Sequence, residues 1–180
     1  MMIDLRFLAA SDLDAYWSIR LEALESVPEA FGSSPEEHHA LTREEIAVRI
    51  SFDPSNKFVV GAFVGDRLVG TAGFFRDKGL KERHKGHIWG VYVAREARGK
   101  RAGLGMLRML LERATAIEGI EQIMLSVATT QQAAGSLYRS LGFESYGCER
   151  RALKIGERYV DEEHMVLFIH KPHCRPDVPD

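Results

Sequence analysis

The chain has 180 residues, of which 45% are hydrophobic and 28% are charged, and it carries a net charge of -2 at pH 7. This length predicts one domain that can bury a sizeable core. The composition is that of an ordinary globular protein, and the slightly acidic balance argues against a nucleic acid as the main partner.

The sequence contains no feature that points to export, to a membrane or to a metal ion. The N-terminal residues MMIDLRFLAASD have no long apolar segment of the signal-peptide kind, and no stretch approaches the roughly 20 apolar residues that span a bilayer. Cys148 and Cys174 lack the spacing of a disulfide framework or a metal site. His164, His170 and His173 have no cysteine at a useful ligand spacing. We therefore expect a cytoplasmic protein with no metal and no membrane partner.

The N-terminal segment predicts a strand followed by a helix. Residues 3–8 form a short β-rich run, and Ser11 with Asp14 predicts a capping box at the start of the helix. The apolar residues that recur at helical spacing are Leu13, Tyr16, Trp17, Leu21 and Leu24. Pro28 is expected to end this helix.

A loop and a second, shorter helix are predicted next. Residues 29–41 contain the run GSSP, which is typical of a loop. Thr42 and Glu45 then form a capping box for a helix that continues to about residue 50.

The middle of the chain predicts three strands and a long helix. Residues 57–64 and 67–75 are rich in β-branched and aromatic side chains, and the dipeptide Gly65-Asp66 between them predicts a tight hairpin. Residues 87–93 form a further strand. The helix after it is marked by Leu104, Leu107, Leu110, Leu111 and Ala114.

The C-terminal part predicts a strand, a helix and a final pair of strands. Residues 123–127 form a buried strand, and the helix over residues 131–140 is followed by Gly142, which suits a left-handed cap. The last two strands are predicted over residues 144–153 and 158–168.

No internal repeat, low-complexity tract or linker divides the sequence. We expect one domain over residues 1–170 and an irregular tail over residues 171–180, which contains three prolines. The order of the elements predicts an α+β (mixed α/β) fold with a largely antiparallel central sheet.

The loop after the strand at residues 87–93 combines glycines with positive charge. Residues 98–105 read RGKRAGLG. The free N–H groups at a helix start and the positive end of the helix dipole attract phosphate oxygens, and Gly99 and Gly103 let the main chain approach a ligand closely. The spacing matches neither a P-loop nor a dinucleotide-binding fingerprint. The loop therefore predicts a phosphate site, with a solvated basic helix start as the alternative.

This loop resembles the coenzyme motif of the GNAT superfamily of acetyl-CoA-dependent N-acetyltransferases. In that family a strand is followed by [QR]-x-x-G-x-[GA] at a helix start, and the residues from Arg98 to Gly103 occupy this motif. Arg101 stands at the position of the first motif glycine. We expect its N–H group to reach a phosphate without a positive φ, because residues other than glycine avoid that conformation.

A second resemblance to the same family follows downstream. Residues 126–143, SVATTQQAAGSLYRSLGF, are similar to the family pattern N-x-x-A-x-x-L-Y-x-x-x-G-F. Gln131 stands in place of the asparagine, which moves the amide by one methylene group. The two motifs lie in the family order and at about its separation, so together they indicate this family.

The resemblance implies a GNAT-like sheet that is splayed at the coenzyme site and flanked by helices, with acetyl-CoA in the splay. The main chain of residues 91–93 would face the pantetheine arm, and the N–H groups of residues 98–104 would hold the pyrophosphate. The residues implied to contact the coenzyme are Val91, Tyr92, Val93, Arg98, Gly99, Lys100, Arg101, Ala102, Gly103, Leu104, Gln131 and Tyr138.

The resemblance also implies that Tyr138 hydrogen-bonds the coenzyme sulfur and acts as general acid; a plain core tyrosine is the alternative. The attacking amine must be neutral, and a lysine-like amine with a pKa of about 10.4 is almost fully protonated at pH 7. A general base is therefore useful. We prefer His87, which begins its strand where many family members carry an acidic base. Glu29, which borders the loop over the substrate, is the other candidate.

The candidates for contact with the acceptor are Glu29, Phe31, Ser33 and Tyr159, since acidic and aromatic groups suit a cationic amine. We expect acetylation of a primary amine on a small molecule, by direct attack in a ternary complex. The alternatives are a protein N-terminal or lysine acetyltransferase and a catalytically weak acyl-CoA-binding regulatory module. A closed acceptor pocket would favour a small molecule, and an open groove would favour a protein. Dimerisation is common in such folds, so a homodimer is left open.

Overall fold

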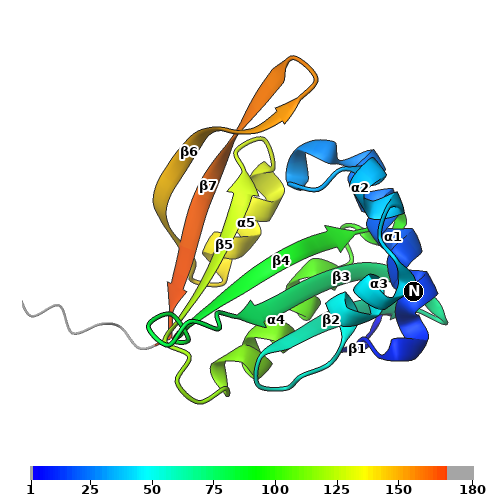
Figure 1. Cartoon of the computed structure of the whole chain (residues 1–180), viewed down its shortest axis with the longest axis horizontal. Helices are drawn as coiled ribbons and strands as arrows, with labels where there is room; N and C mark the ends of the chain where they lie inside the picture. The colour runs from blue at the N-terminus through cyan, green and yellow to red at the C-terminus, as the bar shows by residue number, and fades with distance from the viewer. Residues whose placement is uncertain (1, 170–180) are drawn as a thin grey trace, which may run out of the picture.

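Seven strands form one sheet in the computed structural model, which describes residues 2–169 (Figure 1). In their order across the sheet the strands are β1 (Asp4–Phe7), β2 (Lys57–Val64), β3 (Arg67–Arg76), β4 (Lys85–Val93), β5 (Gln122–Ala128), β7 (Arg158–Phe168) and β6 (Glu144–Ile155). Neighbouring strands are antiparallel except β4 and β5, which are parallel. The predicted mixed fold with a largely antiparallel sheet is confirmed. The predicted tail over residues 171–180 lies outside the described residues.

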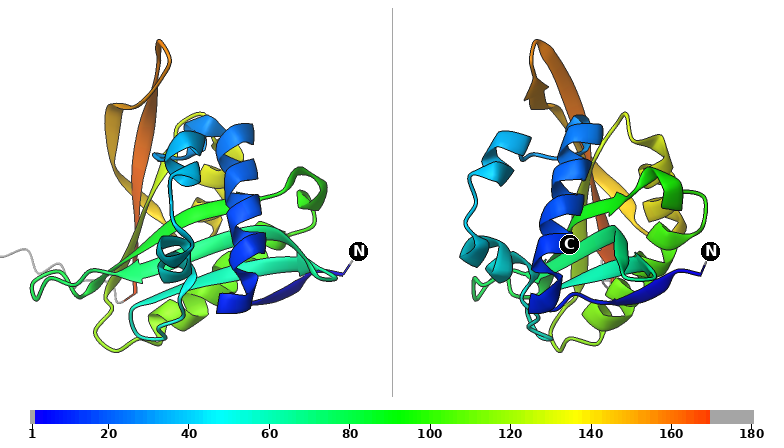
Figure 2. Two further views of the ribbon diagram at one scale, coloured as in Figure 1. Left: turned by 45° about the vertical axis from the view of Figure 1, so that its right-hand side comes forward. Right: turned by 90° about the vertical axis from the view of Figure 1, so that its right-hand side faces the viewer.

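Helices cover both faces of the sheet. Figure 2 shows the three N-terminal helices on one face and the two later helices on the other. The α-helices are α1 (Leu13–Ser26), α2 (Pro35–His39), α3 (Arg43–Ile50), α4 (Ala102–Thr115) and α5 (Gln132–Ser140), and the short 3-10 helices are η1 (Ala10–Asp12), η2 (Pro28–Ala30) and η3 (Arg95–Ala97).

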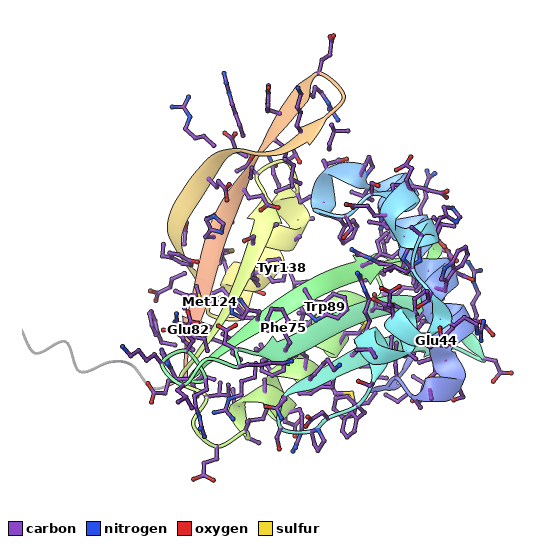
Figure 3. The ribbon with its side chains drawn as sticks, in the orientation of Figure 1. Glu44, Phe75, Glu82, Trp89, Met124 and Tyr138 are labelled. Carbon is purple, nitrogen blue, oxygen red and sulfur yellow. The ribbon has the colours of Figure 1, made fainter. Side chains whose placement is uncertain are left out.

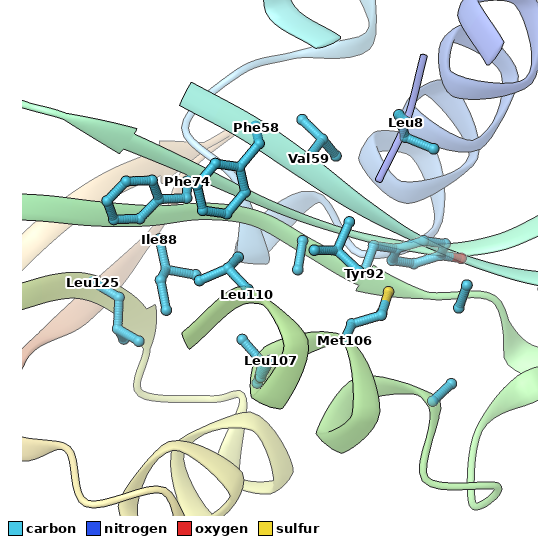
Figure 4. Close-up of a cluster of buried hydrophobic side chains, with 14 of the residues drawn as sticks. Leu8, Phe58, Val59, Phe74, Ile88, Tyr92, Met106, Leu107, Leu110 and Leu125 are labelled. Carbon is cyan, nitrogen blue, oxygen red and sulfur yellow. The ribbon is translucent and has the colours of Figure 1, made fainter. Parts of the chain in front are cut away.

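The main core lies between the sheet and α4 (Figure 4). Apolar side chains of α4 recur at intervals of three and four residues, so one face of the helix packs on β2, β3 and β4. Met106, Leu107 and Leu110 on this face are fully buried. Opposite them, the rings of Phe58 and Phe74 stack with their centroids 4.9 Å apart. Burying each of these large side chains stabilises the fold by about 1.5–3 kcal/mol.

The start of α1 differs from the predicted capping box of Ser11 and Asp14. The N–H group of Ala9 instead donates to Oδ2 of Asp12 at 2.8 Å, and Arg6 of β1 pairs with the same carboxylate at 2.7 Å. Because Asp12 is held against β1, the chain makes the single 3-10 turn η1 before α1 begins.

The segment predicted as a loop over residues 29–41 contains η2 and α2. Ser34 and Glu37 form a reciprocal capping box, in which the N–H of Ser34 donates to Oε2 of Glu37 at 2.8 Å. Pro35 then occupies the first helical position, where its missing N–H group costs nothing. The capping box predicted for Thr42 and Glu45 is present at the start of α3.

The two central strands β4 and β5 separate after a short common stretch. They pair only over Lys85–His87 and Gln122–Met124. Beyond that point β4 contains a bulge, where Gly90 has a φ of 61° and its carbonyl accepts a hydrogen bond from the Thr71 hydroxyl at 3.1 Å. The edge of β4 after His87 therefore has no strand beside it, and the predicted splay of the sheet is confirmed.

Candidate active site

A cavity of about 840 Å³ opens where β4 and β5 diverge. Its walls are β4, the loop into α4, β5, the start of α5 and the segment after α1. The residues that line it are 26–27, 29–31, 88–93, 97–99, 101–104, 125–128, 131, 133–134 and 137–138. A cavity of roughly 300–1,000 Å³ is the usual size of a site for a drug-sized ligand.

The start of α4 supplies main-chain donors to this cavity. The first hydrogen bond of the helix runs from the N–H of Gly105 to the carbonyl of Arg101 at 2.9 Å, so the N–H groups of residues 102–104 have no partner inside the helix. Gly99 and Arg101 are both left-handed, with φ angles of 75° and 61°. Left-handed residues beside free N–H groups at a helix start are typical of anion sites. The arrangement fits a diphosphate.

The conformation of Arg101 differs from the prediction that its N–H group would act without a positive φ. Arg101 is the N-cap of α4, and the chain reverses there from the loop into the helix. The left-handed backbone makes this turn, although a side chain in that conformation costs roughly 1 kcal/mol. The expectation was therefore wrong, and the loop holds backbone strain at the start of α4.

Two basic side chains of the loop bind main-chain carbonyls. Nε of Arg98 donates to the carbonyl of Val93 at 3.0 Å, and Nζ of Lys100 donates to the carbonyl of Glu96 at 2.7 Å. Arg98 lines the cavity, whereas Lys100 does not. These contacts shape the loop, whose residues 101–104 line the cavity.

The open edge of β4 forms a second wall of the cavity, where Val91, Tyr92 and Val93 were expected. All three line it. The hydroxyl of Tyr92 points to α1 instead, where it donates to Oε1 of Glu22 at 2.9 Å. With this side chain committed to α1, β4 presents mainly its unpaired main chain to a ligand.

Tyr138 of α5 lines the cavity beside the splay (Figure 3). The residue is only 6% exposed, and its ring packs edge-on against Phe143 with the centroids 6.0 Å apart. Burial raises the pKa of the Tyr138 hydroxyl well above its ordinary value. The hydroxyl therefore stays protonated at physiological pH and can donate a hydrogen bond.

Glu29 and Phe31 reach the same cavity from the segment after α1. The side-chain amide of Gln131, at the start of α5, donates to Oε1 of Glu29 at 3.2 Å. Gln131 lines the cavity too, but this bond directs its amide to Glu29. The resemblance to the sequence motif had instead implied that the Gln131 amide contacts the coenzyme.

His87, the preferred base, does not line the cavity within the described residues. Its Nε2 atom lies 2.9 Å from Oδ2 of Asp77, and its ring stacks on Phe75 with the centroids 4.8 Å apart. It lies in the stretch where β4 still pairs with β5, before the strands diverge. A residue there is held by its neighbours on the sheet, away from the splay, and this argues against His87 as the base.

Two predicted acceptor residues also lie elsewhere. Ser33 lines a smaller, separate cavity beside α1. Tyr159 lies near the turn between β6 and β7, is 49% exposed and packs against Arg151 and Lys154. Neither side chain lines the main cavity.

The structure adds a polar chain that the sequence motifs did not indicate. Ser126 of β5 lines the cavity, and its hydroxyl lies 2.8 Å from Nδ1 of His164 on β7. Nε2 of His164 lies 3.4 Å from a carboxylate oxygen of Glu149 on β6. The alternation of side chains along the paired strands could have placed Ser126 and His164 together only if their register were known.

Within residues 2–169, no cluster of three or more His, Cys, Asp or Glu side chains has the arrangement of a metal site. None of the helices in the described part of the chain combines the length and the apolar composition needed to cross a membrane.

Comparison with known proteins identifies a family match and several structural neighbours. The model of the acetyltransferase (GNAT) family matches residues 17–143. N-alpha-acetyltransferase RimI of Mycobacterium tuberculosis is 38% identical over 103 residues, which are 57% of this chain and 61% of that protein. This chain thus matches less than two thirds of the relative's length.

Solved structures share the fold over most of the chain. An acetyltransferase of the GNAT family from Streptococcus pneumoniae has a TM-score of 0.82 at 21% identity and covers 93% of this chain and 99% of its own. A GNAT superfamily phosphinothricin acetyltransferase from Sinorhizobium meliloti, solved in complex with AcCoA, has a TM-score of 0.79 at 25% identity and covers 93% of this chain and 89% of its own.

Proposed function

Since the chain belongs to the acetyltransferase (GNAT) family, we propose that it transfers an acetyl group from acetyl-CoA to a primary amine on a small molecule. The observation that carries this proposal is the single cavity shared by the free N–H groups at the start of α4, the open edge of β4 and the Tyr138 hydroxyl. The N–H groups would bind a diphosphate, and the open edge of β4 would pair with an amide-containing arm. The Tyr138 hydroxyl would donate a hydrogen bond.

The coenzyme supplies an activated thioester when it is bound. Residues 98–99 and 101–104 would hold its pyrophosphate. The main chain of residues 91–93 would hold its pantetheine arm by adding to the open edge of β4. Tyr138 donates a hydrogen bond to the sulfur as negative charge develops on it, which stabilises the departing thiolate. The raised pKa of the Tyr138 hydroxyl, caused by burial, keeps the proton available for this bond.

The amine attacks directly in a ternary complex, so its proton needs an acceptor within the cavity. Glu29 is the carboxylate that lines the cavity on the side of α1. We assign the proton to Glu29, which replaces His87 in this role. Its hydrogen bond from Gln131 fixes the carboxylate toward α5.

The acceptor side is partly covered, which supports a small molecule as the acceptor. The η2 segment contacts both β5 and β6, and a Cβ placed on Gly32 would lie 3.9 Å from the side chain of Leu153 on β6. The segment after α1 therefore meets the outer strands above the cavity. A long peptide would have to displace this contact.

A second candidate is acetylation of a protein N-terminus, and the relative named RimI favours it. A third, a weakly active acyl-CoA-binding regulatory module, follows from Arg101 and Gln131 in place of the motif glycine and asparagine. A homodimer and a cytoplasmic location remain predictions.

The test measures thiol release from acetyl-CoA with a panel of small amines and with peptides of varied N-terminal residue. We expect turnover with small amines and little with peptides. The reverse preference would establish the second candidate. Calorimetric binding of CoA without turnover on any amine would favour the regulatory module, and the absence of CoA binding by folded protein would refute all three.

A further inference from the structure

A second, smaller cavity lies beside α1. Figure 2 shows that α1 lies on the same face of the sheet as α2 and α3. Its volume is about 230 Å³, and the polar residues that line it are Arg20, Ser33, Glu37, His38 and Arg49. None of these residues belongs to the two coenzyme motifs. The cavity is large enough for one small polar group.

The guanidinium of Arg20 is buried in the wall of this cavity. The residue is 7% exposed, and its Nε and Nη1 atoms have no hydrogen-bond partner within residues 2–169. A buried charge that lacks a partner destabilises the folded state strongly. An anion bound in the cavity would account for an arginine at this position.

The protein groups around Arg20 do not neutralise its charge. Burial lowers the pKa of Arg20, the Tyr16 hydroxyl raises it and Arg49 lowers it, and no carboxylate contributes. The guanidinium carbon lies 4.4 Å from the ring centroid of Phe31, a cation–π contact that offsets part of the burial cost. Glu37 lines the cavity, but its carboxylate accepts the N–H of Ser34 in the cap of α2.

Arg20 also lies beside the acceptor end of the main cavity. Its Nη1 atom lies 3.9 Å from the position that a Cβ on Gly90 would occupy. Gly90 and Phe31 both line the main cavity, and Gly90 forms the bulge of β4 at the splay. A group bound to Arg20 would therefore lie next to the place where the amine attacks.

We propose that the acceptor amine carries a carboxylate and that Arg20 binds this carboxylate. The planar guanidinium can donate two parallel hydrogen bonds to it, and Arg49 adds positive charge from α3. This inference rests on the proposed acetyl transfer and narrows the acceptor to small amino acids or similar carboxylate-bearing amines. A protein N-terminus has no carboxylate at that distance from its amine unless a side chain supplies one.

The experiment compares the common L-amino acids with the matched amino-acid amides in the thiol-release assay. We expect acetylation of some acids, with kcat/KM about 10- to 100-fold lower for their amides. In Arg20→Met we expect the same loss for the acids and no change for the amides. Equal rates for acids and amides in the wild-type protein, or an equal loss on both in Arg20→Met, would refute the proposal.

Arg43→Met is the matched control, because Arg43 lies on α3 outside this cavity and pairs with Asp14 at 2.6 Å on the surface. It should leave the preference for acids unchanged. A loss of that preference in Arg43→Met would mean that net charge, rather than the site, selects the acids.

Thermal unfolding provides a readout that does not depend on acetyl transfer. Arg20→Met should raise the Tm in sodium chloride, because it removes an uncompensated buried charge. Sodium acetate should raise the Tm of the wild-type protein above its value in sodium chloride of equal ionic strength, and should not do so in Arg20→Met. A lower Tm of Arg20→Met in both salts would mean that Arg20 stabilises the fold and does not bind a carboxylate, which would refute the proposal. Failure of the folded protein to bind CoA would refute the proposed function but would leave this comparison of salts intact.

Discussion

The amide nitrogen of Gln131 lies 3.2 Å from a carboxylate oxygen of Glu29, and this contact joins the start of α5 to the segment after α1. The two residues are 102 positions apart in the chain. Both line the main cavity, so the bond fixes a carboxylate beside the helix that carries Tyr138. This position is the reason why Glu29 is assigned the proton of the attacking amine.

Glu29→Gln should lower kcat, because the amide keeps the size of the side chain but cannot take a proton. We expect a loss of about 10²-fold or more at pH 7, with CoA affinity unchanged. The loss should shrink toward pH 9, where the neutral fraction of a lysine-like amine is about 100-fold larger than at pH 7. Steady-state rates at both pH values, together with calorimetry for CoA, provide the measurement.

Glu25→Gln is the control, since Glu25 is exposed on the last turn of α1 and does not line the cavity. Equal turnover of Glu29→Gln and the wild-type protein at pH 7 would show that Glu29 is not the base. The hydrogen-bonded pair of Ser126 and His164 would then be the next candidate.

Tyr138→Phe should lower kcat while leaving CoA binding nearly intact. The substitution keeps the packing against Phe143 and removes only the hydroxyl that we propose stabilises the thiolate. Loss of one such donor typically costs about 10²–10³-fold in kcat. Tyr159→Phe is the control, because the Tyr159 side chain lies outside the cavity. It should leave both kcat and CoA binding unchanged. A Tyr138→Phe enzyme with wild-type kcat would make Tyr138 a core residue only.

The helix start at α4 could be predicted because its signal is local in the chain. Free N–H groups at the start of α4 and the glycines before it are consecutive residues, so their spacing carries the information. The left-handed conformation of Arg101 could not be predicted, because the need for it arises from the angle between the loop and α4. From the sequence, an arginine at this position argued against that conformation, because residues other than glycine avoid a positive φ.

The residues that we propose for the acceptor side could not be predicted from the sequence, because their positions depend on contacts between distant segments. His87 was chosen from its place at the start of a strand, but the pairing of β4 with β5 continues past it, so it lies away from the splay. The burial of Arg20 was not predicted, because the helical pattern of α1 was read from apolar residues alone. Its burial beside Phe31 is visible only once α1 packs on the sheet.

Arg101→Gly should stabilise the protein, since glycine adopts the φ of 61° without a steric cost. We expect a gain of roughly 1 kcal/mol in the free energy of unfolding. Arg101→Ala separates this effect from the loss of charge, because alanine retains the Cβ and the strain. Both variants should bind CoA with similarly reduced affinity. If urea unfolding gave equal stability for the two variants, the left-handed conformation would not be strained.

Alkaline pH should destabilise the fold through its buried tyrosines. Burial raises the pKa values of Tyr16 and Tyr138 in the folded state, whereas an unfolded tyrosine titrates near pH 10. Their contribution is therefore complete below about pH 10 and is lost as the pH rises above it, by up to roughly 1.4 kcal/mol per pH unit for each tyrosine.

Tyr16→Phe isolates one of these two groups, because the Tyr16 hydroxyl is buried without a hydrogen-bond partner in the described part of the chain. The free energy of unfolding in urea, measured at pH 8 and at pH 11, should fall less in Tyr16→Phe than in the wild-type protein. Tyr146→Phe, at a residue that is 55% exposed, is the control and should show the full wild-type loss. If the free energy of unfolding fell equally in all three proteins, groups other than Tyr16 would cause the loss of stability at alkaline pH.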